Sequence, residues 1–127
     1  MTGPTTPPSQ QNDETARYVA TARTDLQEND LAGARSALKK AMDEGPADGE
    51  ALTLNQELLS REQARDAALS TARACLAQRS WKCAWHSAGN ALSIDSSSAE
   101  ASALVQRSLV DWGAANQPAR PGTDPGP

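Results

Sequence analysis

The chain has 127 residues, a formal net charge of −4 and a sequence pI of about 4.9. An acidic protein without a basic cluster repels the phosphate backbone, so we expect no nucleic-acid partner. No run of 18 apolar residues and no charged-then-apolar leader is present, so we expect a soluble chain without membrane insertion. Two compartments stay open: the cytoplasm, or an extracytoplasmic site if the chain is a domain excised from an anchored protein.

Both ends of the chain are rich in proline and poor in large apolar side chains. Such ends cannot bury enough surface to offset their ordering entropy, so residues 1–12 and 116–127 are expected to be disordered tails or linkers. Residues 13–115 contain a single proline, Pro46, no phenylalanine, and many alanine, leucine, glutamine, glutamate and arginine residues. Strong helix formers dominate, which predicts one all-α domain over residues 13–115.

Two helices are predicted before Gly45–Pro46. The first begins with Asp13 as its N-cap, and apolar residues follow at helical spacing at Val19, Ala22 and Leu26. Asn29–Asp30 is expected to form a turn. A second apolar stripe covers residues 31–42, and it ends at the glycine and proline because they favour a C-cap and stop a helix.

The third predicted helix is unusually long. It follows Asp48 as N-cap, and neither glycine nor proline interrupts the sequence between Gly49 and Ser80. We therefore expect one helix of about 30 residues, or about 45 Å, with a polar middle at residues 60–63. A fourth helix is predicted over residues 81–94, and Ser96–Ser98 should cap a fifth over residues 99–112. The prediction is about five helices.

The sequence repeats itself at an offset of 50 residues. The segment Thr-Ala-Arg-x-x-Leu occurs at residues 21–26 and again at 71–76, and Glu-Ala-x-x-Leu occurs at residues 50–54 and 100–104. Conservative pairs in the same frame include Leu31 with Trp81. An internal repeat of this size indicates a helical array, in which each unit buries its apolar face against its neighbour.

The first repeat resembles the tetratricopeptide (TPR-like) helical hairpin. Residues at the positions of that pattern are Tyr18, Ala22, Asn29–Asp30–Leu31, Ala34, Leu38, Ala41 and Pro46. The second hairpin matches more weakly, through Ala68, Ala72, Trp81, Ala84, Ala88 and Ala91. The spacing departs from the family's 34 residues, which puts a continuous concave groove in doubt. The resemblance implies two TPR-like hairpins joined through the long helix.

In that family the first helix of each hairpin contacts the ligand. Carried over to this sequence, the resemblance implies a partner-binding set of Val19, Arg23, Leu26, Gln27, Leu69, Arg73 and Leu76. The two arginines could bind a carboxylate, which suggests an acidic partner segment. The alternative is that both arginines are ordinary surface residues that pair with neighbours.

Two cysteines flank the predicted turn between the third and fourth helices. Cys75 and Cys83 would lie at similar heights on adjoining helices, so they are disulfide candidates. The alternative is that both are small buried side chains. His86, the only histidine, shares a helix face with Cys83, but a fourth ligand is lacking and we expect no metal. The three tryptophans are expected in the core, with a partner anchor as the alternative.

The function expected from these patterns is a protein–protein interaction module, such as an adaptor, scaffold or assembly factor. The alternative is a structural oligomerisation domain, a homodimer that pairs through its long central helix. The sequence has no nucleophile with an oriented base and no glycine-rich phosphate loop. We therefore expect no enzyme activity and no cofactor.

Overall fold

The computed structural model describes residues 8–45 and 49–117, and these residues form five α-helices and no strand. The helices are α1 (Pro8–Gln27), α2 (Leu31–Asp43), α3 (Gly49–Ala77), α4 (Trp81–Ile94) and α5 (Ala99–Ala115). The all-α prediction with about five helices is confirmed. Among the described helices, none is both long and apolar enough to span a membrane.

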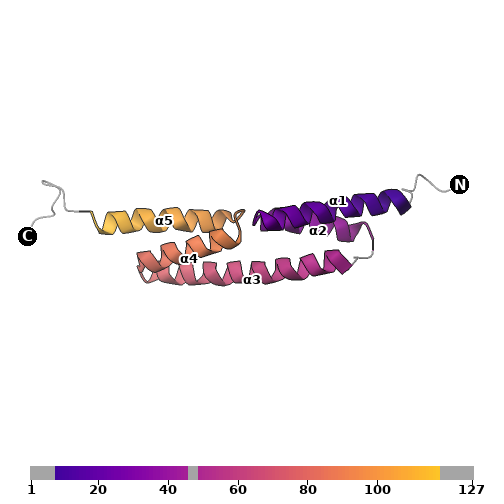
Figure 1. Ribbon diagram of the computed structural model, residues 1–127. Coiled ribbons are helices and arrows are strands. Elements are labelled where there is room, and N and C mark those ends of the chain that lie inside the picture. Colours follow the sequence, from indigo (N-terminus) through magenta and orange to yellow (C-terminus); the bar gives the residue numbers. More distant parts are fainter. Residues whose placement is uncertain (1–7, 46–48, 118–127) are drawn as a thin grey trace, which may run out of the picture.

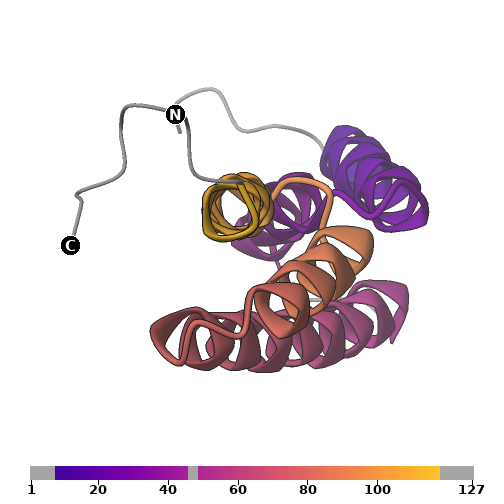
Figure 2. The same ribbon diagram turned by 90° about the vertical axis from the view of Figure 1, so that its left-hand side faces the viewer.

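The long helix α3 packs against each of the other four helices, and the outer ends of α1 and α5 extend beyond it (Figure 1). The α1–α2 hairpin packs on its N-terminal half, and α4 folds back along its C-terminal half before α5 reverses again. In Figure 2, turned by 90°, α1 and α5 lie on the side of the molecule opposite α3, and α4 lies between α5 and α3. The molecule is therefore elongated, with the α1–α2 pair and the α4–α5 pair set end to end along α3.

Two three-helix units share α3. The first unit consists of α1, α2 and residues 49–62 of α3, and the second consists of residues 63–77 of α3, α4 and α5. Residues that are 50 positions apart in the sequence occupy equivalent places in the two units. Asn29 and Arg79 both adopt a left-handed conformation, with φ of 61° and 60°, and equivalent backbone bonds close both turns. The sequence repeat is therefore a structural repeat.

The two units have cores of different size. The first unit buries a continuous apolar cluster made of Val19, Ala22, Leu26, Leu31, Ala34, Ala37, Leu38, Ala41, Ala51, Leu54 and Leu58. The buried cluster of the second unit contains Leu69, Ala91 and Ala101, with Ala68, Leu92 and Leu104 packed against it. Because alanine buries less surface than leucine, the second unit gains less from apolar burial.

Two predicted helix boundaries are wrong. Helix α1 begins at Pro8 rather than at Asp13. Proline is well tolerated in a first helical turn, where its missing N–H has no partner to lose. Helix α5 continues through Gly113 to Ala115, so that glycine does not end it. Of the tails expected at residues 1–12 and 116–127, residues 1–7 and 118–127 lie outside the described residues, as do the predicted stop at Pro46 and the predicted cap at Asp48.

Among the predicted N-caps on described residues, Asp13 instead lies inside α1, whereas the cap expected within Ser96–Ser98 is present at Ser98. Asp30 is the N-cap of α2, and its Oδ1 accepts a hydrogen bond of 2.9 Å from the Gly33 amide. Ser98 caps α5 by accepting a hydrogen bond of 3.1 Å from the Ala101 amide. Ser80, the residue equivalent to Asp30, makes no side-chain cap bond to α4. The start of α4 therefore differs from the start of α2.

Candidate partner-binding site at the open end of the second unit

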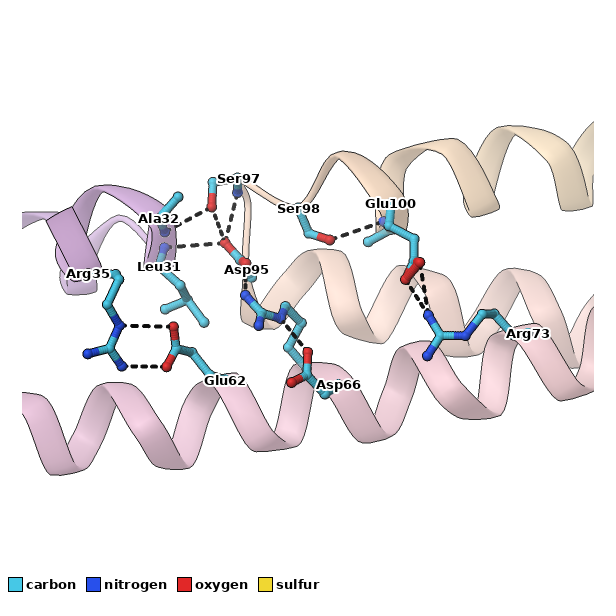
Figure 3. Close-up of polar contacts among 12 residues, drawn as sticks. Leu31, Ala32, Arg35, Glu62, Asp66, Arg73, Asp95, Ser97, Ser98 and Glu100 are labelled. Carbon is cyan, nitrogen blue, oxygen red and sulfur yellow. Dashed lines mark hydrogen bonds and ion pairs between the residues drawn. The ribbon is translucent and has the colours of Figure 1, made fainter.

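The two units meet where the loop between α4 and α5 reaches the first turn of α2 (Figure 3). Asp95 is buried there, and its Oδ1 accepts hydrogen bonds from the backbone amides of Leu31 at 3.2 Å and Ser97 at 3.0 Å. The Ser97 hydroxyl accepts a hydrogen bond of 3.1 Å from the Ala32 amide. The first amides of α2 are thus bonded by a segment far away in sequence.

The charge of Asp95 is balanced from α3. The Arg65 guanidinium donates to its second carboxylate oxygen at 2.8 Å. Burial alone would raise the pKa of Asp95, but hydrogen bonds from Ser97, Arg65 and the Leu31 amide outweigh it and lower the pKa. Asp95 is therefore held as a carboxylate at the N-terminus of α2, where the helix dipole also favours a negative charge.

The polar middle of α3 binds other helices of the same chain. Arg61 donates a hydrogen bond of 2.8 Å to the Leu26 carbonyl and also bonds the Asn29 side chain. Glu62 forms a bidentate ion pair with Arg35 of α2, with distances of 2.6 and 3.4 Å. These contacts explain why α3 has a polar centre, since that segment lies at the junction of the two units.

A groove lies between α4 and α5 at the far end of the second unit. Its volume is about 290 Å³. Its lining contains all three tryptophans of the chain and consists of Trp81, Lys82, Trp85, Ser108, Leu109 and Trp112. Trp85 and Trp112 are 42% and 52% exposed, although large aromatic side chains are usually well buried.

The repeat explains how the groove arises. In the first unit, Leu58 is fully buried at the position that Ser108 occupies in the second. Serine is smaller than leucine, and the Ser108 hydroxyl turns back to donate to the Leu104 carbonyl at 2.6 Å. The space that leucine fills in the first unit is thus left open in the second.

The rim of the groove also differs between the units. The first unit joins α2 to α3 at this place through the ion pair between Arg35 and Glu62. The equivalent positions in the second unit are Trp85 and Trp112, on α4 and α5. An ion pair that joins two helices is therefore replaced by two indole rings that line a cavity.

Beside the groove, a second and more polar depression shares Trp81 with it. Its lining is Leu76, Ala77, Arg79, Trp81, Arg107, Asp111 and Ala114. The turn beneath it is closed by a disulfide between Cys75 and Cys83, whose Cα atoms are 5.7 Å apart. The disulfide prediction agrees with the structure. The bond fixes the start of α4 against the end of α3.

The residues of the predicted partner-binding set lie in three environments. Val19, Leu26 and Leu69 are buried in the two cores, so their side chains are not presented to a partner. Arg23 pairs with Glu50 and Arg73 with Glu100, in repeat-equivalent ion pairs on the surface. Gln27 is exposed. Leu76 is half-buried and is the one member of the set that lines a described cavity.

The expectation that the tryptophans are core residues is wrong for Trp85 and Trp112. The alanines on the inner face of α4 already lie against α3 and α5, so the indole rings stay on the outer face. Sequence reasoning also missed Ser108 and Leu109. The pairing of Leu58 with Ser108 in the repeat frame was the available signal, because it replaces a large apolar residue by a small polar one.

No protein-family model, curated protein or solved structure matches the chain. The candidate site therefore rests on the structure itself. His86 is exposed, with its ring centroid 5.0 Å from that of Trp85, and Cys83 is held in the disulfide. Within the described residues, no group of three or more histidine, cysteine, aspartate or glutamate side chains is arranged to hold a metal ion.

Proposed function

We propose that the protein is a TPR-like interaction module that binds a segment of another protein in the tryptophan groove between α4 and α5. The observation behind the proposal is the position of Trp85 and Trp112, which are both about half exposed and line the same cavity. Tryptophan is enriched among residues that dominate binding energy, because a large rigid ring gains much contact area at small entropic cost. Binding rather than catalysis is the proposed activity.

The shape of the groove supports a peptide or helix as the ligand. Its cavity of about 290 Å³ is near the lower end of the range for small-molecule sites. Val110 of α5, next to Leu109, adds an apolar side chain that is 68% exposed. A partner helix could place one apolar side chain between the indole rings and cover the rest of α5, as in helix-in-groove recognition.

A displayed library of random peptides provides the test. We expect the immobilised protein to select peptides with apolar residues at helical spacing, and their binding to alter tryptophan emission. Since every tryptophan lines the groove, emission reports on binding there. The Trp85→Ala, Trp112→Ala variant should lose binding by at least about 100-fold, as expected for paired interface anchors.

The repeat offers a matched control. Leu109 lines the groove, while its equivalent Leu59 lies on α3 outside it, and both are 44% exposed. Leu109→Ala should weaken the selected peptides, whereas Leu59→Ala should leave their affinity unchanged. Peptides that bind equally well to the double tryptophan variant would contradict the proposal.

Oligomerisation through α3 remains the alternative function. The exposed leucines Leu52 and Leu59 on α3 favour it. The polar middle of α3 weighs against it, because Arg61, Glu62 and Arg65 are already bound within the chain. Sedimentation velocity separates the two proposals. A dimer abolished by Leu52→Ala and Leu59→Ala would favour pairing through α3.

A further inference from the structure

Residues 94–97 of the same chain bind to one end of the first unit, as a segment of a partner protein could. Ile94 packs against the apolar cluster of the first unit, and Asp95 and Ser97 accept hydrogen bonds from the first two amides of α2. Ser96 completes the contact by donating its backbone N–H to the Asn29 carbonyl at 2.8 Å. An apolar residue followed by aspartate and two serines therefore covers this end of the first unit.

The equivalent end of the second unit has the same backbone but no such cover. Trp81 and Lys82 correspond to Leu31 and Ala32, and Arg79 corresponds to Asn29. Within the described residues, nothing accepts a hydrogen bond from the amides of Trp81 and Lys82, and the Ser80 side chain does not cap α4. The tryptophan groove lies directly beside these amides, because both residues line it.

The charges at this end suit an acidic ligand. The first unit has the uncharged Asn29 and Ala32 where the second has Arg79 and Lys82. Arg65, which balances Asp95 in the first unit, corresponds to Ala115 in the second. The second unit therefore has Arg79 in the turn just before α4 and Lys82 in the first turn of α4, close to the positive end of the helix dipole.

We infer that the open end of the second unit binds a segment of a partner protein in which an aliphatic side chain directly precedes an aspartate, in the manner of Ile94–Asp95. The inference rests on the proposed function and specifies the chemistry of its ligand. The aliphatic side chain enters the tryptophan groove. The carboxylate accepts a hydrogen bond from the Trp81 amide, as Asp95 does from the Leu31 amide, and it pairs with the Lys82 ammonium group.

The test uses a synthetic peptide that copies residues 88–98, with both ends blocked. The peptide contains no tryptophan, so any change in emission comes from the protein. We expect binding to change tryptophan emission and to shift the backbone amide resonances of Trp81 and Lys82. The same peptide with asparagine in place of aspartate should bind about tenfold more weakly, because it loses a charge-assisted hydrogen bond at a helix N-terminus.

Two matched protein variants test the charge of the site. Lys82→Glu places a negative charge beside the expected carboxylate and should weaken the aspartate peptide at least about tenfold, while it should affect the asparagine peptide less. Lys39→Glu makes the same charge change on an exposed residue of α2 and should leave both peptides unaffected. High salt should reduce the difference between the two peptides.

The outcomes separate this inference from the proposed function. Equal affinity of the aspartate and asparagine peptides would overturn the carboxylate recognition and leave the groove as a binding site. If neither peptide binds, the inference is also overturned. Peptides from the random library that bind in the groove would still support the proposed function. Shifts at Leu31 and Ala32 instead would show that the peptide displaces the chain's own loop, which would likewise overturn it.

Discussion

The first unit buries leucine at positions where the second unit has alanine, serine or tryptophan. Leu38 corresponds to Ala88, Leu58 to Ser108 and Leu31 to Trp81. The second unit instead has a disulfide across the turn that precedes α4. The same backbone is thus stabilised by leucine burial in one unit and by a disulfide in the other. The smaller core of the second unit leaves the groove between α4 and α5 open for binding.

The two positions that hold the disulfide cysteines in the second unit illustrate this difference. Cys75 and Cys83 correspond to Asp25 and Gly33 in the first unit. A Cβ atom at Gly33 would lie 2.5 Å from an Asp30 carboxylate oxygen and 2.8 Å from one of Asp25. The first unit therefore needs glycine where helices α1 and α2 approach each other, because its aspartate cap occupies the space that a side chain would take.

The largest effect is expected at the junction between the units. Asp95→Ala should lower the free energy of unfolding by about 3 kcal/mol, because it leaves Arg65 and the Leu31 amide without their partner. Chemical denaturation measures the loss, and Glu100→Ala at an exposed ion pair serves as the control. Similar losses in the two variants would show that the junction contributes no more than a surface contact.

The same carboxylate predicts a pH dependence. The folded-state pKa of Asp95 lies below its value in the unfolded chain, which is about 3.9. Its contribution to stability is therefore fully present above that value and is lost as the pH falls through the folded pKa. The difference in unfolding free energy between the natural chain and Asp95→Asn should shrink over this range. A difference that stays constant down to pH 2 would contradict the assignment.

Reduction of the disulfide should cost the second unit about 2–3 kcal/mol, as a short closed loop does in the chain-entropy description. Denaturation with and without reductant gives the value. The first unit allows a transfer experiment, in which Asp25→Cys, Asp30→Ser and Gly33→Cys introduce the residues of the second turn at three equivalent positions. Mass spectrometry should then detect a second disulfide. Two thiols that persist under mild oxidation would show that the turns are less alike than their backbones.

Filling the groove should make the second unit resemble the first. Ser108→Leu places the residue of the first unit at the equivalent position, and the added apolar burial should stabilise the chain by about 1 kcal/mol. The same variant should lose the peptides that bind the tryptophan groove. If stability falls instead, the bulk of Trp81 already excludes a leucine there.

The smallest effect is expected for the repeated surface arginines. Arg23→Ala and Arg73→Ala should each cost about 0.5 kcal/mol or less, because their ion pairs with Glu50 and Glu100 are about half exposed. Binding of the groove-selected peptides should not change in either variant. A marked loss of affinity would restore the arginines as part of the binding site.

Local patterns in the sequence predicted the helices, the turns and the repeat. The Asn29–Asp30 turn and the uninterrupted run after Gly49 depend on neighbouring residues only, so they can be recognised without a structure. The disulfide was one of two predicted alternatives, since Cys75 and Cys83 flank a turn between antiparallel helices. Helix ends were less predictable, because Pro8 can start a helix as well as precede one.

The junction could not be predicted, because its partners are far apart in the sequence. Asp95 accepts a hydrogen bond from the Leu31 amide, 64 residues away in the sequence, and no local pattern marks Arg65 as the balancing charge. The groove could be predicted only by comparing equivalent positions at which the two units have different residues. Matching residues indicated the repeat, whereas the mismatch between Leu58 and Ser108 marks the candidate site.

A helix shared by two units also sets their relative phase. Each residue inserted into the middle of α3 would turn the second unit by about 100° about the helix axis and move it by about 1.5 Å. One added residue would carry the Asp95 loop away from Leu31, and seven would restore the direction but leave a gap of about 10 Å. The number of residues between the units is therefore as constrained as their identity, although most side chains along that stretch face solvent.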